Sequence, residues 1–374
     1  MPIHSPRRDA EPGRNGQSPA AKRLARLRAR MEKEKIGSIL ITTLSNVQYL
    51  TGFTGSAGSL LVTAGGSIFF TDSRYDIQAR EEVSGSHVEI VKSDSMTAAA
   101  KRAGRGRGGR VGFESGTVSF QGHKRLRELA PRARLVPTVG VVEELRVEKD
   151  ADEIEKIRKA VALGSRALEE TLPLLRPGMT ELEVAAEIEY RMRRYGGEGP
   201  SFETIVATGP RAALPHARAT TRRIRPNEFI LLDLGVILGG YVSDMTRTVF
   251  LGKAPARAVR IYRAVKEAVE EAEQAVQAGR SGEDLDKAAR KVLRRYGYEQ
   301  YFTHSLGHGV GREVHELPRV SRGQKAPLPE GAAITIEPGV YLEGYGGVRI
   351  EDIVIVRKGS GDVLTPTSKE LMEL

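Results

Sequence analysis

The sequence predicts two lobes, an α/β lobe near the N-terminus and an α+β lobe that follows it. Up to about residue 146, short apolar strands alternate with helical stretches, which is typical of α/β domains. Beyond that point, helical stretches give way to glycine-rich strands, as in α+β folds. The chain has 374 residues, and at about 150 residues per domain this length fits two to three domains.

The composition excludes several functional classes. Hydrophobic residues make up 40% and charged residues 28%, so the chain is globular. The absence of cysteine excludes disulfide frameworks, cysteine-ligated metals and thiol catalysis. The net charge of +10 permits acidic partners without requiring them, and we expect no nucleic-acid partner. No apolar run approaches the roughly 18 residues of a membrane span, so we expect no membrane insertion.

The N-terminal lobe is expected to follow a flexible tail. Residues 1–20 are polar and lack the apolar stretch of a signal peptide, which favours a cytoplasmic protein. A helix is expected from Ala21 and a buried strand over 38–43. Two further strands should be joined by a turn at 64–66.

The second lobe should begin near residue 148 with a long amphipathic helix. Thr180 and Glu183 have the spacing of a capping box, so a helix should begin there and end near Gly196. Pro255 suits the first position of a helix reaching Ala278. A last helix should run from Ser281 to Gly297.

Two acidic residues interrupt an apolar hairpin in the second lobe. Asp233 lies in one strand and Asp244 in the next, separated by a Gly-Gly sequence. A two-residue turn at Leu238–Gly239 would set the two carboxylates directly opposite each other. A turn shifted by one residue would make them diagonal, still on one face of the sheet. Like charges that face each other destabilise a sheet, so something must compensate for them.

A second acidic pair flanks another turn. Glu337 and Glu351 are equidistant from Gly344, so a loop with an odd number of residues centred there sets them opposite each other. Arg349 shares the face of Glu351, whereas Asp352 points the other way.

The combination of these four carboxylates with nearby histidines predicts a metal site. A single acidic residue near a hairpin is ordinarily solvated, and the His-Gly segment 304–316 alone fits a structural loop equally well. If the four carboxylates share one pocket, however, each like-charge pair near 4 Å would cost up to about 4 kcal/mol. A domain with a net stability of roughly 5–15 kcal/mol could not carry that cost uncompensated. Two divalent cations would cancel the four charges. Oxygen ligands with one imidazole suit manganese, cobalt or zinc, and such ions acidify a water for hydrolysis.

These residues resemble the metal ligands of the pita-bread metallopeptidases. That family includes methionine aminopeptidase, aminopeptidase P, prolidase and the metal-free creatinases. The segments 46–58 and 71–79 are similar to the N-terminal lobe of aminopeptidase P and prolidase, and the resemblance covers about residues 24–374. The positions that match the five ligands are Asp233, Asp244, His308, Glu337 and Glu351.

The resemblance implies a domain organisation and a cofactor. After the tail over 1–20 that the composition predicts, it implies a creatinase-type α/β N-terminal domain over 21–147 and a pita-bread α+β catalytic domain over 148–374. It further implies two divalent metal ions per chain, with manganese expected and cobalt or zinc as alternatives, and a homodimer.

The resemblance also assigns roles to individual residues. His216 would contact the substrate, His304 would line the pocket beside proline, and His315 would stabilise the tetrahedral intermediate. Arg349 would lie near the substrate. Glu337 would accept a proton as well as bind metal, so the expected catalytic residues are His216, His315 and Glu337.

The implied activity is hydrolysis of the bond between an N-terminal residue and proline. The segments FTGSAG and TDSRY favour an Xaa-Pro aminopeptidase acting on proline-containing peptides. The alternative is an Xaa-Pro dipeptidase (prolidase), which the arginine-rich segment 216–225 favours because an arginine can hold a dipeptide's carboxylate. A catalytically silent peptide-binding protein on the same fold is a further alternative, although such relatives usually lose metal ligands.

Overall fold

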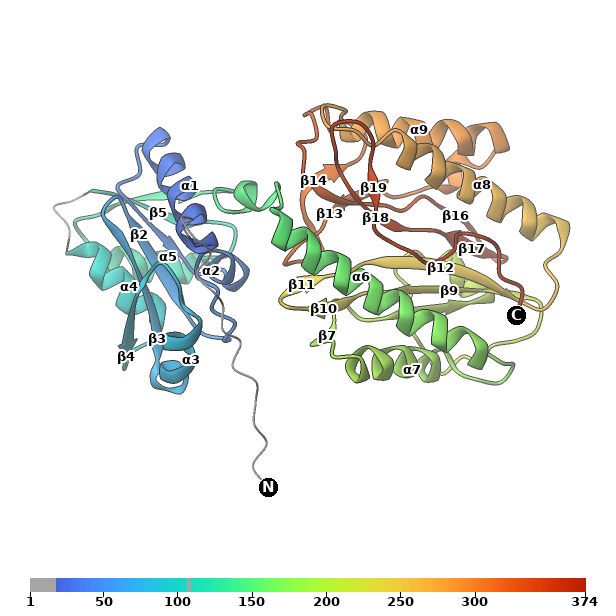
Figure 1. The fold of residues 1–374 in the computed structure, drawn as a ribbon, viewed down its shortest axis with the longest axis horizontal. Helices are drawn as coiled ribbons and strands as arrows, with labels where there is room; N and C mark the ends of the chain where they lie inside the picture. The colour runs from blue at the N-terminus through green and yellow to red at the C-terminus, as the bar shows by residue number, and fades with distance from the viewer. Residues whose placement is uncertain (1–17, 106–108) are drawn as a thin grey trace, which may run out of the picture. The chain divides into compact units, whose positions relative to one another are not determined.

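The computed structural model describes residues 18–105 and 109–374, which form two compact units divided after Leu145 (Figure 1). The expected tail over 1–20 lies almost wholly outside the described residues. Its last two residues instead begin helix α1 (Pro19–Lys33). Proline suits this position because the first turn of a helix needs no backbone N–H, and the Ser18 side chain accepts a hydrogen bond from Ala21 N at 3.2 Å.

The N-terminal unit is a mixed six-stranded sheet with helices on both faces. The strand order is β4-β3-β2-β1-β5-β6, in which β1–β2 and β2–β3 are antiparallel and the other pairs parallel. The strands are β1 (Ser38–Ile41), β2 (Ser59–Thr63), β3 (Gly66–Asp72), β4 (His87–Val91), β5 (Arg110–Glu114) and β6 (Arg134–Thr138). The remaining helices are α2 (Leu44–Thr51), α3 (Asp76–Glu82), α4 (Ser95–Gly104) and α5 (Phe120–Leu129).

Successive side chains along these strands point to opposite faces of the sheet and form two apolar layers. Ile39 and Ile41 pack with α1 and α2, whereas Leu40 packs with α4 and α5 on the other face. Both faces of the sheet are therefore covered, which confirms the α/β prediction for this unit.

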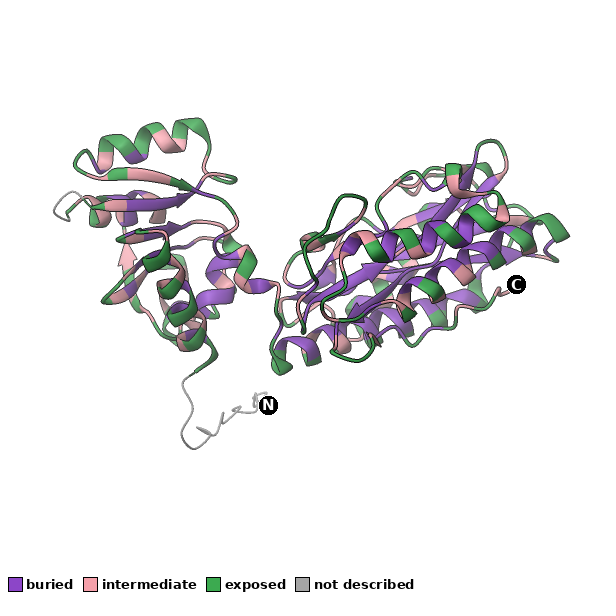
Figure 2. Ribbon diagram, turned by 90° about the horizontal axis from the view of Figure 1, so that it is seen from above, coloured by how far each residue is buried: buried purple, intermediate pink, exposed green. Residues whose placement is uncertain are grey.

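The C-terminal unit places two helix pairs on opposite sides of antiparallel sheets (Figure 1), and the strands between them are largely buried (Figure 2). The helices are α6 (Ala151–Thr171), α7 (Glu181–Arg194), α8 (Ala256–Gln274) and α9 (Gly282–Tyr296). The strands are β7 (Gly199–Pro200), β8 (Ile205–Thr208), β9 (Glu228–Leu234), β10 (Val236–Leu238), β11 (Tyr241–Val242), β12 (Met245–Leu251), β13 (Gly307–Gly309), β14 (Glu316–Val320), β15 (Ala333–Ile336), β16 (Gly339–Leu342), β17 (Gly346–Arg349), β18 (Asp352–Ile355) and β19 (Asp362–Val363).

Strand β9 shows how this arrangement turns a carboxylate inward. Ile230 and Leu232 pack with α6 and α7, whereas Phe229 and Leu231 pack on the α8 and α9 side. Asp233 has the parity of Phe229 and Leu231, so its side chain shares the face of the sheet on which α8 and α9 pack. The α+β prediction is confirmed, and its interior contains acidic groups.

The helix ends agree with the expected signals at two helices and differ at a third. Thr180 and Glu183 form the predicted capping box, and Gly297 ends α9 with a φ of 79°. Helix α8 differs, because Pro255 is its N-cap with a ψ of 159° rather than its first residue. It ends at Gln274, short of the expected Ala278, because residues beyond it turn away so that Ala278 N donates to Arg357 O. Among the described residues, no helix is long and apolar enough to cross a membrane.

Candidate metal centre

The hairpin that contains Asp233 and Asp244 turns one residue later than the first expectation. Leu238 pairs with Tyr241 and Asp233 pairs with Thr246, which places the turn at Gly239–Gly240. The expected turn at Leu238–Gly239 is therefore wrong, and the shifted alternative holds. The reason is local: a tight turn of this kind needs positive φ at both central residues, and the two glycines have φ of 61° and 70°. In this register, Asp244 lies diagonally from Asp233.

The second acidic pair has the predicted register. Gly339 pairs with Arg349 on one side, and Ile336 pairs with Asp352 on the other. Glu337 and Glu351 lie between these paired positions and therefore opposite each other. The turn is centred on Gly344, as expected from the equal spacing.

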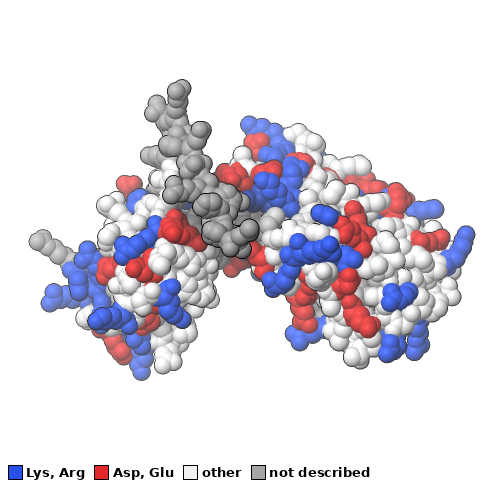
Figure 3. Space-filling view, turned by 60° about the horizontal axis from the view of Figure 1, so that its bottom comes forward, with Lys and Arg blue, Asp and Glu red and all other residues white. Residues whose placement is uncertain are grey.

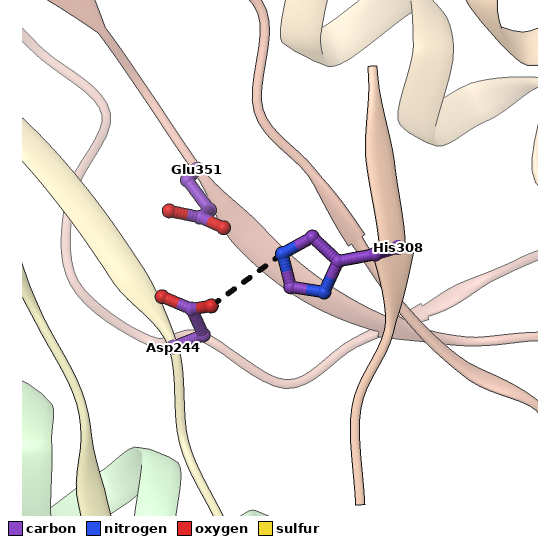
Figure 4. Close-up of side chains that lie close together, drawn as sticks. All are labelled: Asp244, His308 and Glu351. Carbon is purple, nitrogen blue, oxygen red and sulfur yellow. Dashed lines mark ion pairs between the residues drawn. The ribbon is translucent and has the colours of Figure 1, made fainter. Parts of the chain in front are cut away.

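The two hairpins meet through Thr246. Its carbonyl accepts from Glu351 N at 3.1 Å, and its hydroxyl donates to Glu351 Oε2 at 2.7 Å. These contacts bring the Glu351 carboxylate beside Asp244 and His308, and one donor atom from each lies within 4.8 Å of the others (Figure 4). His308 Nε2 is 3.7 Å from Asp244 Oδ2 and 3.4 Å from Glu337 Oε1.

His308 presents a lone pair to these carboxylates. Its Nδ1 lies 3.1 Å from Gly309 O, which can only accept, so Nδ1 bears the proton and Nε2 is free to bind a cation. Burial, followed by the charge of His315, lowers the pKa of His308 to about 4, so the ring is neutral at neutral pH.

Removal from water disfavours the charged form of three acidic residues of the site. Burial, together with the charge of Glu351, raises the pKa of Asp244 and of Glu337 well above the usual range. Burial and the charge of Asp233 raise the pKa of Glu351 to about 8. Arg349 provides one compensating charge, and its Nη2 donates to Asp233 Oδ2 at 2.6 Å.

Asp233 Oδ1 is buried and has no hydrogen-bond partner. A buried carboxylate oxygen without a partner is costly unless a cation binds it. Four carboxylates and one imidazole are also the donor set that divalent ions of the manganese, cobalt and zinc type accept. The residues present therefore fit a metal centre.

The other predicted histidines lie around this centre. The ring of His315 is 4.3 Å from the ring of His308, and its side chain is exposed. Partial burial of the ring and then the nearby charge of His216 lower the pKa of His315. His216 is exposed in the loop after the short helix η4 (Gly209–Ala213). His304 Nδ1 lies 4.0 Å from Glu337 Oε2.

Tyr341 is a site residue that sequence reasoning missed. Arg349 Nη1 donates to its hydroxyl at 2.8 Å, and the hydroxyl in turn donates to His304 Nε2 at 2.8 Å, because His304 Nδ1 already donates to Ser305 O. Burial raises the pKa of Tyr341 to about 12, so the hydroxyl keeps its proton. The position of Tyr341 four residues after Glu337, in a strand otherwise apolar, was the available signal.

The arginines of 216–225 are mostly engaged within the fold. Arg222 donates to both oxygens of Glu228, at 2.7 and 2.6 Å. Arg223 donates to Gly178 O at 2.7 Å. Arg218 is exposed and pairs with Glu203 at 3.2 Å.

Comparison with known proteins identifies the family. Residues 155–358 match the family model of metallopeptidase family M24, and residues 23–147 match the creatinase/prolidase N-terminal domain. The chain belongs to metallopeptidase family M24. Peptidases of this family are dinuclear metal enzymes, which agrees with the donor set described above.

Relatives of the M24 peptidase match it over nearly its whole length. An Xaa-Pro dipeptidase of Pyrococcus furiosus is 36% identical over 94% of this chain and 99% of its own. The structure of an Xaa-Pro dipeptidase from Bacillus anthracis is 36% identical, with a TM-score of 0.91, covering 95% of this chain and 100% of that one. An X-Pro aminopeptidase from Thermotoga maritima is also 36% identical, with a TM-score of 0.86, covering 92% and 100%.

Proposed function

We propose that this M24 peptidase is an Xaa-Pro dipeptidase that depends on two divalent metal ions. The observation that carries the proposal is the convergence of His308 with the buried carboxylates of Asp244 and Glu351 and the half-buried one of Glu337. Beside them, Asp233 keeps a buried oxygen without a partner. The relatives named as Xaa-Pro dipeptidases support the dipeptidase alternative better than the aminopeptidase that the sequence first favoured.

The proposed ligands are the five residues at the two hairpins and β13. They are Asp233, Asp244, His308, Glu337 and Glu351. Manganese is the proposed metal, with cobalt or zinc as alternatives, because the set lacks thiolates and contains mainly carboxylate oxygens. When bound, such ions polarise the scissile carbonyl and acidify a water.

The proposed chemistry of the chain itself concerns protons and charge. Glu337 has a pKa raised by burial, so its carboxylate is suited to accept a proton from the attacking water and pass it to the departing proline nitrogen. His216 and His315 lie on the exposed side of the centre, where an N–H can donate to the developing oxyanion. His304 is proposed to line the proline pocket, held there by Tyr341. Arg349 keeps Asp233 oriented.

An Xaa-Pro aminopeptidase is the second candidate. The Thermotoga maritima X-Pro aminopeptidase supports it, being as similar in sequence as the dipeptidases above. The five ligands do not separate the two activities, since both cleave the same bond.

Product analysis under one metal condition tests the proposal. The protein is stripped with a chelator, reconstituted with manganese, and given Xaa-Pro, Xaa-Pro-Xaa and longer peptides of one series. We expect rapid cleavage of the dipeptide and little release from longer peptides. Equal or faster release from tripeptides would make the protein an aminopeptidase. No cleavage of either class with manganese, cobalt or zinc would refute the proposed activity.

Two further parts of the proposal concern the cell and the assembly. We propose a cytoplasmic location and a homodimer, the second supported only by the family resemblance. Cell fractionation and sedimentation velocity measure these two properties directly.

A further inference from the structure

Arg247 is a fully buried arginine whose five N–H donors are all used. It lies in β12, and its side chain is 0% exposed. Nε donates to Ser368 O at 2.9 Å, and Nη1 donates to Thr246 O at 2.9 Å and to Glu351 O at 2.8 Å. Nη2 donates to Asp352 Oδ1 at 2.7 Å and to Thr367 O at 2.6 Å. One guanidinium thus joins three separate segments of the chain.

These acceptors surround the backbone of one proposed metal ligand. Glu351 lies between β17 and β18, outside either strand. Its carbonyl accepts from Arg247, and the next residue, Asp352, accepts from the same guanidinium. On the opposite face of β12, Thr246 donates to the Glu351 carboxylate. Glu351 is therefore held at its side chain and its backbone N–H by Thr246, and at its backbone carbonyl by Arg247.

The charge of Arg247 is matched locally. Asp352 is 0% exposed and pairs with Arg247 through one oxygen and with Lys369 through the other. Lys369 Nζ also lies 3.1 Å from Glu273 Oε2. A buried ion pair of this kind is retained only where its hydrogen bonds are complete, and a lysine at position 247 cannot complete them, because an ammonium has three donors at one point.

We propose that Arg247 is a positioning residue for the metal centre: it fixes the Glu351 backbone against the C-terminal segment 367–369, so that the Glu351 carboxylate faces Asp244 and His308. This inference rests on the proposed metal site. Partners that orient a ligand in this way typically change metal affinity by about 10–100-fold when they are altered.

Arg290 provides a matched control. It is also buried and pairs with an aspartate, with Nε 2.7 Å from Asp286 Oδ2. It donates to two carbonyls, those of Phe302 and His304, but to no backbone group of a proposed ligand. Arg290→Lys therefore disrupts a buried guanidinium with three hydrogen bonds, against five for Arg247, without altering the support of Glu351.

The experiment measures metal binding in the full chain, without reference to turnover. Wild type, Arg247→Lys and Arg290→Lys are stripped with a chelator, checked for fold by circular dichroism, and titrated with Mn²⁺ by calorimetry and with Co²⁺ by visible absorption. We expect Arg247→Lys to weaken the affinity of at least one ion by about 10–100-fold and to alter the Co²⁺ spectrum. Arg290→Lys should remain close to wild type.

The outcomes separate this inference from the proposed function. If the wild type binds neither ion, the proposed metal centre fails. If the wild type binds both ions and folded Arg247→Lys binds them equally well, or Arg290→Lys loses as much affinity, the positioning role fails while the metal centre stands. Should Arg247→Lys not fold, Arg247→Gln, which leaves Asp352 paired with Lys369, gives the same comparison with the same criteria.

Discussion

Arg349 binds Asp233 through a single oxygen: Nη2 donates to Oδ2 at 2.6 Å, and Oδ1 is left buried without a partner. The arginine therefore orients the carboxylate and leaves one oxygen available. The compensation that the sequence requires for its facing carboxylates is thus provided by Arg349 only in part. Burial raises the pKa values of the other three carboxylates, those of Asp244, Glu337 and Glu351. Their negative charges therefore require cations for balance.

The first prediction concerns metal content. The reconstituted protein should contain two divalent ions per chain by elemental analysis. Asp244→Ala and Glu351→Ala should each lose at least one ion and all measurable turnover. Both variants should stay folded without metal, because each removes a buried carboxylate that its neighbours repel. The exposed Asp152→Ala serves as the control. Fewer than one ion per wild-type chain would contradict this assignment.

The second prediction concerns His216 and His315. Alanine at either position should lower the rate by about 10²–10⁴-fold, as expected for a positioned proton donor, while both ions remain bound. His87→Ala, an exposed histidine of the N-terminal unit, should change neither quantity. Loss of metal in His315→Ala would show that its role is ligation, and full turnover in both variants would show that the two histidines are structural.

The third prediction is a dependence of stability on pH through Glu273. Burial, followed by the charge of Asp352, raises the pKa of Glu273 from 4.5 to about 8. Between these values the folded state holds a proton that the unfolded state has lost, so the free energy of unfolding falls as pH rises, by up to about 5 kcal/mol. Below pH 4.5 and above pH 8 this contribution is constant.

Glu273→Gln should remove that contribution. Urea unfolding of wild type and variant at pH 5, 6, 7 and 8 should show the variant gaining relative stability as pH rises. Glu271→Gln, on an exposed position of the same helix, should follow the wild type. Parallel pH profiles for wild type and Glu273→Gln would contradict the raised pKa.

The fourth prediction assigns the arginine-rich segment to stability. Arg222→Ala removes the guanidinium that donates a hydrogen bond to each oxygen of Glu228, whose side chain is only 11% exposed. This change should destabilise the fold by about 1–3 kcal/mol. It should leave the ratio of Xaa-Pro to Xaa-Pro-Xaa turnover unchanged. Arg218→Ala, whose side chain is 82% exposed, should cost little stability. A changed substrate ratio in Arg222→Ala would instead place this arginine at the substrate's carboxylate.

Local chemistry in the sequence predicts much of the proposed site. The spacing of Glu337 and Glu351 about Gly344 was enough to set their register, because strand pairing about a turn is symmetrical. To predict the register of the first hairpin, the position of its turn must be known as well. The Gly-Gly pair at 239–240 sets that position, because both turn residues adopt positive φ angles that only glycine adopts readily.

Contacts between distant segments could not be predicted in this way. Thr246 meets Glu351 across 105 positions, and neither hairpin specifies the approach of the other. In the sequence, Arg247 resembles an ordinary charged residue near the start of a strand, and only the fold supplies its five acceptors. The choice between dipeptides and longer peptides likewise depends on space around the site, which residue types alone do not encode.

The turn at Gly239–Gly240 restricts how this part of the gene can change in length. If Gly239 and Gly240 keep their two-residue turn, one residue inserted after them shifts the pairing of the following strand by one position and turns Asp244 and Thr246 away from Glu351. Two inserted residues shift the pairing by two positions and keep the face. Length variation that preserves this turn should therefore occur in even steps, even though the turn lies at the surface, where insertions are ordinarily tolerated.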